Sequence, residues 1–259
     1  MELREIVENR LEEHVDEVYR DGHAPLFVGV HGSWNYDLVD EQSDVDTVAV
    51  VFPTFDDFVF GKSPVSTTKK MGNGEQISLK DVRVFFAEFW KQNPSCLQLL
   101  FTKYKYVDTF FERLWSDLCA KREAIARFDE VAAVRSILGC AQTCYRTMMR
   151  RPHDDFGKNL SNIFRFTNFV EAYTSGLSYE ECLASFSVFS KDFIMTTKRN
   201  KDGIDYDTAL ELAGNALGRL CSRVDDFERQ RHKTDLTVKK QVEDIQRNIM
   251  RAGCWHEGW

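Results

Sequence analysis

The chain has 259 residues, of which 43% are hydrophobic and 29% are charged, a balance that is ordinary for a folded globular protein and argues against a disordered one. No apolar stretch approaches the roughly 20 residues needed to span a bilayer, which argues against a membrane-spanning protein. The net charge of −7 is divided unevenly, because residues 1–100 hold 9 Lys and Arg against 18 Asp and Glu, whereas the remainder carries a net +2. The chain opens on a charged amphipathic pattern rather than a signal peptide, and its seven cysteines show no Cys-x-x-Cys spacing, so we expect a cytoplasmic protein with reduced thiols.

The first hundred residues carry the signals of a small sheet with helices. Apolar residues recur at helical spacing over residues 2–20 and stop before Gly22, which predicts an amphipathic helix. Residues 26–30 and 45–52 are short, nearly continuous apolar runs, which are typical of buried strands. Farther on we expect an irregular connection over residues 54–74 with a short strand at 66–70, then a strand at 76–81, a helix at 82–92 and an edge strand within 99–107.

From residue 108 onward strand signals nearly vanish and helical periodicity takes over. The helices that we expect span residues 110–126, 130–150, 157–174, 179–189, 206–231 and 236–250. No low-complexity linker marks a boundary, so the boundary is placed by the change of periodicity alone. The sequence therefore predicts an α+β fold in which a domain with a mixed sheet, residues 1–107, is followed by an all-helical domain, residues 108–259.

Two carboxylates separated by one residue stand at the start of the second apolar run. On an extended strand the side chains at i and i+2 point to one face, so Asp44 and Asp46 would project side by side. Val45 and Thr47 would face the other way. Because Mg²⁺ prefers hard oxygen ligands, this pair indicates a metal site.

The spacing of these residues from an upstream Gly-Ser pair resembles a known signature. Gly32-Ser33, ten intervening residues and Asp44-Val45-Asp46 resemble the motif of the DNA polymerase β superfamily of nucleotidyltransferases, and the subgroup associated with RNA ligases and RNA repair is the most similar. That subgroup has the motif Gly-Ser-x-x-Tyr-Gly-Leu followed by Ser-Asp-x-Asp, and farther along the chain a turn of the form Asn-Pro-x-x-x-(Glu/Gln)-Leu-Leu. The matching residues here are Gly32, Ser33, Tyr36, Leu38, Ser43, Asp44, Asp46, Asn93, Pro94, Gln98, Leu99 and Leu100. Asp37 departs from the pattern, which usually has glycine there, although Asp tolerates a left-handed backbone better than most residues. The resemblance covers residues 26–102.

This resemblance implies a polymerase β-like fold for the first domain and the transfer of a nucleoside monophosphate from an NTP, ATP being the expected one, to a hydroxyl acceptor with release of pyrophosphate. Mg²⁺ or Mn²⁺ ions would stabilise the attacking and leaving oxygens, held by three carboxylates that match Asp44, Asp46 and Asp81. Gly32 and Ser33 would form the turn that meets the β- and γ-phosphates. Glu75, Asp56 and Asp57 are weaker candidates, because they lie in glycine-rich or aromatic loop sequence.

A second candidate site lies in the helical half. Lys158, Asn162 and Arg165 recur at i, i+4 and i+7, opposite the apolar side of the expected helix. In the resembling subgroup a basic pair on such a helix faces the triphosphate, so Lys158 and Arg165 are the predicted phosphate clamp. The alternative is a solvated polar face.

The resemblance and the charge asymmetry favour an RNA or tRNA-like end as the acceptor. The basic residues that could contact it are Arg146, Arg150, Arg151, Lys198, Arg199, Lys201, Arg229, Arg231, His232 and Lys233, unless they are simply solvated helix ends. Two other functions stay open: a catalytically silent nucleotide-binding or antitoxin-like module that works through a protein partner, and a nucleotidyltransferase that acts on a protein or a small molecule.

Overall fold

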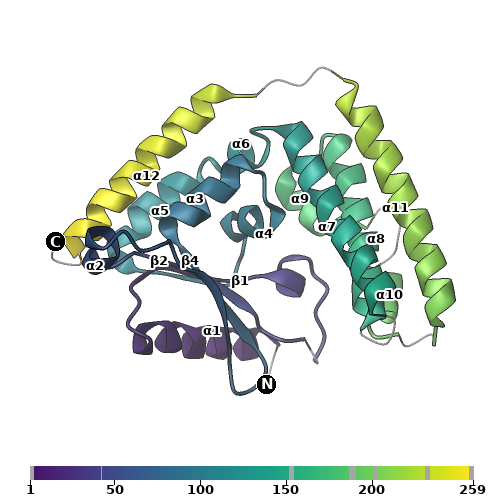
Figure 1. Ribbon diagram of the computed structural model, residues 1–259, viewed down its shortest axis with the longest axis horizontal. Coiled ribbons are helices and arrows are strands. Elements are labelled where there is room, and N and C mark those ends of the chain that lie inside the picture. Colours follow the sequence, from purple (N-terminus) through teal and green to yellow (C-terminus); the bar gives the residue numbers. More distant parts are fainter. Residues whose placement is uncertain are drawn as a thin grey trace. The chain divides into compact units, whose positions relative to one another are not determined.

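The computed structural model describes residues 3–41, 43–151, 155–186, 191–200, 203–230 and 234–256, which fall into two compact units (Figure 1). Unit 1 comprises Met1–Lys91, Ser95–Phe128 and Asp235–Trp259, and unit 2 comprises Gln92–Pro94 and Asp129–Thr234. No helix in the described ranges is both long enough and apolar enough to cross a membrane.

Unit 1 is built on a mixed sheet of five strands in the order β3-β4-β2-β1-β5. The central strands β1 (Pro25–Val30) and β2 (Thr47–Val51) are antiparallel, and β5 (Lys105–Val107) pairs antiparallel with β1 at one edge. On the other side β4 (Gln76–Asp81) runs parallel to β2, and β3 (Ser66–Lys70) closes the sheet antiparallel to β4. The α+β class and the five expected strands are confirmed, although β2 begins at Thr47, after both carboxylates of the Asp-x-Asp motif.

Helices cover both faces of this sheet. The amphipathic helix α1 (Leu3–Arg20) lies on one face (Figure 1). Its apolar stripe packs on alternate strand residues in one core cluster, which contains Val7, Leu11, Val15, Val18, Val28, Val30, Val45, Ala49, Val51, Ile77 and Leu79. On the other face α3 (Val82–Trp90) and α5 (Glu112–Cys119) contribute aromatic rings, with Trp115 stacked 4.2 Å from Phe27 between ring centroids.

The remaining elements of unit 1 are short, apart from the last helix. They are the 3-10 turns η1 (Gly32–Asn35), η2 (Gln98–Leu100) and η3 (Thr109–Phe111), and the helices α2 (Phe55–Val59), α4 (Pro94–Leu97), α6 (Arg122–Ala126) and α12 (Leu236–His256). The single helix predicted over residues 110–126 is therefore broken into η3, α5 and α6. The predicted helix at 236–250 is confirmed and extends farther.

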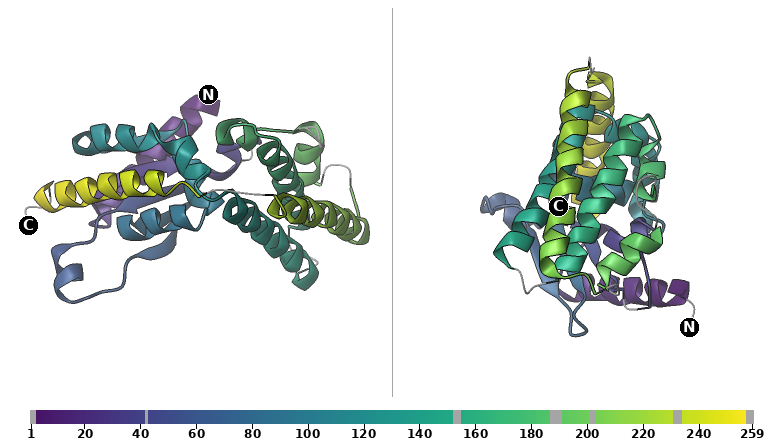
Figure 2. Two further views of the ribbon diagram at one scale, coloured as in Figure 1. Left: turned by 90° about the horizontal axis from the view of Figure 1, so that it is seen from above. Right: turned by 90° about the vertical axis from the view of Figure 1, so that its right-hand side faces the viewer.

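The C-terminal helix belongs to unit 1, which differs from the predicted division at residue 107. Helix α12 runs alongside α5 in two views (Figures 1 and 2). Its Gly253 lies so close to Phe52 that a Cβ atom there would be 2.4 Å from the ring. Hydrophobic periodicity could not predict that the C-terminal helix packs on unit 1, because the pattern of an amphipathic helix does not say which apolar surface the helix covers.

Unit 2 is all-helical, as predicted for this part of the chain. Its helices are α7 (Glu130–Arg150), α8 (Phe156–Thr174), α9 (Tyr179–Leu183), α10 (Lys191–Lys198) and α11 (Tyr206–Glu228). The central helix α8 is buried along most of its length, and its Gly157 permits the close crossing of α10, since a Cβ atom there would lie 2.6 Å from the carbonyl oxygen of Thr197. Helix α10 was not predicted, and the helix expected at 179–189 ends at Leu183; residues 187–190 lie outside the described ranges.

Candidate active site

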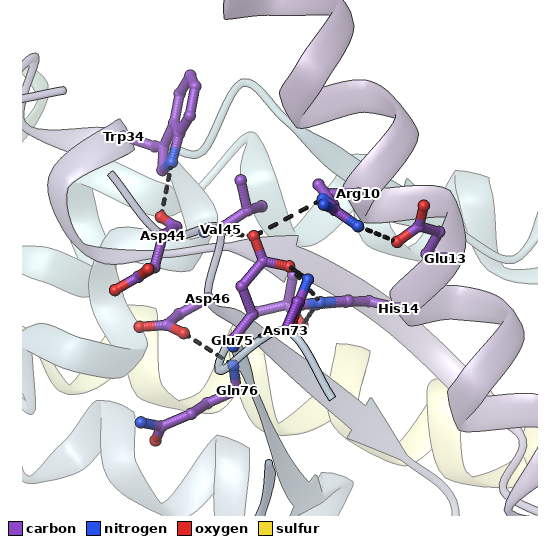
Figure 3. A network of polar contacts seen from close by, with 11 residues as sticks. Arg10, Glu13, His14, Trp34, Asp44, Val45, Asp46, Asn73, Glu75 and Gln76 are labelled. Atoms are coloured by element: carbon purple, nitrogen blue, oxygen red, sulfur yellow. Dashed lines mark hydrogen bonds and ion pairs between the residues drawn. The ribbon is translucent and has the colours of Figure 1, made fainter. Parts of the chain in front are cut away.

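The two carboxylates of the Asp-x-Asp motif lie directly before β2 and project to the same side. Val45 and Thr47 are buried on the α1 side of the sheet, whereas Asp44 is exposed and Asp46 is half-buried. Figure 3 shows both carboxylates pointing away from α1. This is the alternation predicted from the sequence, and it extends to the residues that precede the strand.

Backbone contacts hold this segment in place. The indole Nε1 of Trp34 donates to the backbone carbonyl oxygen of Asp44 at 3.0 Å. The backbone N–H of His31 donates to the backbone carbonyl oxygen of Asp46 at 3.0 Å. One carboxylate oxygen of Asp46 accepts from the backbone N–H of Gln76 at 2.9 Å. Neither carboxylate forms an ion pair with a Lys or Arg side chain anywhere in the described ranges. Both are therefore open to a cation.

The Gly-Ser pair opens the 3-10 turn η1 between β1 and β2. Gly32 has a positive φ of 77°, which favours glycine. Its N–H donates to the side-chain oxygen of Gln98 at 3.2 Å, and Asn35 Nδ2 donates to the same oxygen at 3.2 Å. Gln98 is only 2% exposed and thus anchors the turn from beneath. A phosphate group could use the Gly32 N–H only by displacing Gln98.

Asp37, the departure from the family pattern, has the left-handed backbone that glycine would supply. Its φ is 55°. The flanking Tyr36 and Leu38 are both buried, and their N–H groups donate to the carbonyl oxygen of Ser33 at 3.2 and 3.1 Å. The turn geometry of the motif is therefore compatible with Asp at this position.

Asp81 lies elsewhere, which corrects the prediction that three carboxylates share one site. It is registered with Val51, the last residue of β2, whereas Asp46 precedes Thr47, the first; the five residue steps from Asp46 to Val51 span about 16 Å. Ile77, Leu79 and Asp81 occupy alternate positions of β4, and Ile77 and Leu79 pack on the α1 side of the sheet. Asp81 therefore belongs to that side, whereas Asp46 points to the other. Its side chain accepts from the backbone N–H of Arg83 at 2.7 Å as the N-cap of α3, and pairs with the Arg83 guanidinium at 2.6 Å. Asp81 is a structural cap.

The positions of β4 that share a face with Asp46 carry other residue types. They are Gln76, Ser78 and Lys80, of which Gln76 is exposed and the other two are half-buried. No group of three or more His, Cys, Asp or Glu side chains within the described ranges could hold a metal ion. The site thus offers two carboxylates, and Mg²⁺ is commonly bound by one or two carboxylates together with substrate phosphates and water.

His31 was missed by sequence reasoning. It follows β1 at the spacing of Phe27 and thus lies on the Asp46 side of the sheet. Burial lowers the pKa of His31 below its ordinary value, an effect that Asp46 opposes and Lys80 reinforces. The His31 imidazole therefore lies on the same side of the sheet as Asp46 and interacts with its carboxylate. The only signal in the sequence was its position directly before Gly32.

The weaker carboxylate candidates have structural partners. Asp57 accepts from the backbone N–H of Thr54 at 2.8 Å and pairs with Lys62 at 3.1 Å. These contacts, that to Thr54 first, lower the pKa of Asp57 to about 2. Asp56 lies exposed in the first turn of α2. Glu75 is buried behind the Asp-x-Asp segment and does not face the open side of Asp44 and Asp46 (Figure 3).

The predicted phosphate clamp lies in unit 2. Lys158 is exposed in the first turn of α8, and the half-buried Arg165 places its guanidinium 4.2 Å from the ring centroid of Phe166. Its Nη2 lies 3.5 Å from Asn162 Oδ1, so Asn162 and Arg165 share one side of the helix as predicted. A role toward phosphate stays a prediction. Of the basic residues expected to meet RNA, Lys201, Arg231, His232 and Lys233 lie outside the described ranges.

No protein-family model matches the chain, and no curated protein matches it significantly. The resemblance to polymerase β-type nucleotidyltransferases therefore rests on the motif residues themselves. The Gly-Ser turn follows β1, and Asp44 and Asp46 precede β2, which pairs antiparallel with β1, so this part of the motif lies at one end of the two strands.

Proposed function

We propose that this chain is a metal-dependent nucleotidyltransferase of the polymerase β type. It binds an NTP, ATP being the expected one, through Mg²⁺ or Mn²⁺ at Asp44 and Asp46, and moves the NMP to a hydroxyl acceptor. The observation that carries this proposal is the projection of the Asp44 and Asp46 carboxylates to one side (Figure 3), in the segment that follows the turn opened by Gly32 and Ser33.

The chemistry follows from these groups. Bound metal supplies positive charge that offsets the negative charge of the phosphates. The acceptor oxygen forms a bond to the α-phosphorus while the bond to the pyrophosphate oxygen breaks, and pyrophosphate leaves. Asp44 and Asp46 orient the triphosphate, and His31, whose pKa is lowered by burial, is a candidate to accept the proton of the attacking hydroxyl, because it lies on the Asp46 side of the sheet.

The residues of β4 that lie on the Asp46 side of the sheet favour a second candidate function. Gln76, Ser78 and Lys80 provide no third carboxylate beside Asp46, and the two-metal arrangement described for such transfers uses two ions held a few Å apart. A chain that holds one metal with its nucleotide could serve as a nucleotide-binding or antitoxin-like module that acts through a protein partner without transfer.

One experiment separates the two functions. The protein is incubated with α-labelled NTPs and Mg²⁺ or Mn²⁺, with RNA, tRNA or cell extract as the source of acceptors, and pyrophosphate and label are followed. Transfer of label supports the nucleotidyltransferase, and its destination identifies the acceptor, for which we propose an RNA end. Binding of NTP and Mn²⁺ without pyrophosphate release under any condition supports the silent module.

The proposed RNA contact has its own signature. Since the chain beyond residue 100 carries only +2, binding should depend on few phosphate contacts, and the logarithm of the affinity should fall with the logarithm of salt by about 0.7 per contact for a single strand. Charge reversal at Arg150, Arg151, Lys198 and Arg199 should weaken RNA binding and leave NTP binding unchanged. Label on proteins or small molecules alone, without salt-dependent RNA binding, would exclude the RNA acceptor.

A further inference from the structure

We propose that Glu75 is a positioning residue that fixes the geometry of Asp44 and Asp46 through the backbone of the residue between them. This inference rests on the proposed metal site. It adds a supporting residue behind Asp44 and Asp46, on the side away from the substrate. The side chain of Glu75 comes from the turn between β3 and β4 and is 8% exposed (Figure 3).

The key contact is a hydrogen bond to the centre of the motif. The backbone N–H of Val45 donates to Glu75 Oε1 at 3.2 Å. Val45 separates the two carboxylates in sequence, so fixing its peptide N–H limits how Asp44 and Asp46 can rotate relative to each other. A hydrogen bond to a charged acceptor is stronger than one between neutral groups. Glu75 thus holds a backbone donor that lies between the two proposed metal ligands.

The carboxylate of Glu75 is itself held on several sides. Asn73 Nδ2 donates to Glu75 Oε2 at 2.7 Å, His14 Nε2 lies 3.3 Å from the same oxygen, and Arg10 Nε lies 3.9 Å from Oε1. His14 is fully buried, and its Nδ1 lies 2.9 Å from the hydroxyl of Thr47, the first residue of β2. These contacts connect α1 to Val45 through Glu75 and to Thr47 through His14. They leave the Glu75 carboxylate little freedom to move.

The next residue, Gln76, is the first of β4 and makes a second link. The backbone N–H of Gln76 donates to Asp46 Oδ1 at 2.9 Å. Two consecutive residues, Glu75 at the end of the turn and Gln76 at the start of β4, therefore hold Val45 from behind and Asp46 from the side (Figure 3). The start of β4 acts as a rigid support for the Asp-x-Asp pair, and a metal site needs such support because ligands that are held in place lose less freedom on binding.

The alternative is that Glu75 only stabilises the packing of α1 on the sheet. Glu17 provides a matched control for that role. It lies on α1 one turn after His14 and pairs with Lys69 of β3 at 2.6 Å, so it also connects α1 to the β3–β4 hairpin, yet it has no contact with the Asp44–Asp46 segment. A stabilising role alone would make the two carboxylates equivalent.

The test compares Glu75→Ala, Glu75→Gln and Glu17→Gln by two measurements on the full chain: Mn²⁺ affinity with and without ATP, and hydrogen exchange of the Val45 amide. Glu75→Ala should weaken Mn²⁺ binding at least tenfold and accelerate exchange at Val45. Glu75→Gln keeps an acceptor for Val45 and should stay within about threefold of wild type, because a neutral acceptor still forms the bond. Glu17→Gln should match wild type in both measurements.

A folded Glu75→Ala protein with wild-type Mn²⁺ affinity and wild-type Val45 exchange would overturn the proposal. If wild type itself binds no Mn²⁺, the proposed function fails, and Val45 exchange alone decides whether Glu75 fixes the segment. If Glu75→Ala does not fold, Asn73→Ala takes its place, because the exposed Asn73 acts on the segment only by holding Glu75. Unchanged Val45 exchange in Asn73→Ala would then refute the positioning role.

Discussion

Asp46 and Gln76 are neighbours across the parallel strands β2 and β4, where the backbone N–H of Gln76 donates to the Asp46 carboxylate at 2.9 Å. Both residues precede the first registered pair, Thr47 and Ile77. The exposed Gln76 side chain therefore occupies the position from which β4 could contribute a third carboxylate. An amide there is a weaker cation ligand than a carboxylate, because it carries no charge.

This relationship predicts a gain of metal binding. Gln76→Asp should add a third carboxylate beside Asp46 and raise the number of Mn²⁺ ions bound per chain with ATP from one to two. Transfer should accelerate in parallel, since the second ion can stabilise the attacking oxygen. Electron paramagnetic resonance of free Mn²⁺ gives the stoichiometry. Ser78→Asp, one step farther along the same face, is the control, and equal stoichiometry for wild type and Gln76→Asp would contradict the placement.

Asp81 should behave as a structural residue. Asp81→Asn keeps an N-cap acceptor for α3 but removes the charge that pairs with Arg83, so the free energy of unfolding should fall by about 1–2 kcal/mol. Mn²⁺ affinity should not change. Urea unfolding and a Mn²⁺ titration of the same sample test both statements. Loss of Mn²⁺ binding by a folded Asp81→Asn protein would contradict the structural role and show that Asp81 contributes to the metal site.

The error at Asp81 shows what a linear motif leaves undetermined. Apolar runs were sufficient to predict β1, β2 and β4, and the sequence correctly placed Asp81 at the end of β4 directly before α3. Whether that end meets Asp46 depends on the direction and register in which β4 pairs with β2. The parallel pairing puts the end of β4 beside Val51, away from Asp46, and pairing of distant strands leaves no local trace in the sequence.

Other parts of the site differed in how well the sequence predicted them. At Asp37 the motif indicated only that a left-handed backbone would be tolerated if the turn needed one, and the structure has a φ of 55° there. Gln98 belonged to a recognised turn, but its contact with Gly32 is made across 66 residues and required the structure. Glu75 was discounted because glycines surround it, although the turn that they form is what delivers it to Val45.

The backbone at Asp37 predicts a specific order of stability. Asp37→Gly should leave the free energy of unfolding within about 1 kcal/mol of wild type, because glycine adopts a positive φ without strain. Asp37→Val should lower it by about 1–2 kcal/mol more, since a β-branched residue is strained there. Thermal unfolding of the three proteins measures this order. A Val variant as stable as the Gly variant would contradict the left-handed conformation.

The polar stripe of α8 predicts a kinetic effect. If Lys158 and Arg165 contact the triphosphate in both ground and transition states, Lys158→Ala and Arg165→Ala should raise KM for NTP about tenfold with little change in kcat. Arg135→Ala is the matched control, because Arg135 is a basic residue of the same unit that pairs with Glu228. If both variants have the KM of wild type, Lys158 and Arg165 do not contact the triphosphate and belong to a solvated face of α8.

The proposed transfer depends most on Asp44 and Asp46, and its direct test is the transfer of label from an α-labelled NTP to an acceptor in the presence of Mg²⁺. Wild type should transfer label and release pyrophosphate. Asp44→Ala and Asp46→Ala should each lose at least about 100-fold in rate, since a metal-stabilised transition state contributes several kcal/mol. Both variants should keep the wild-type circular dichroism spectrum, because neither carboxylate packs in the core. Transfer at the wild-type rate by a folded protein that carries both substitutions would contradict the central claim.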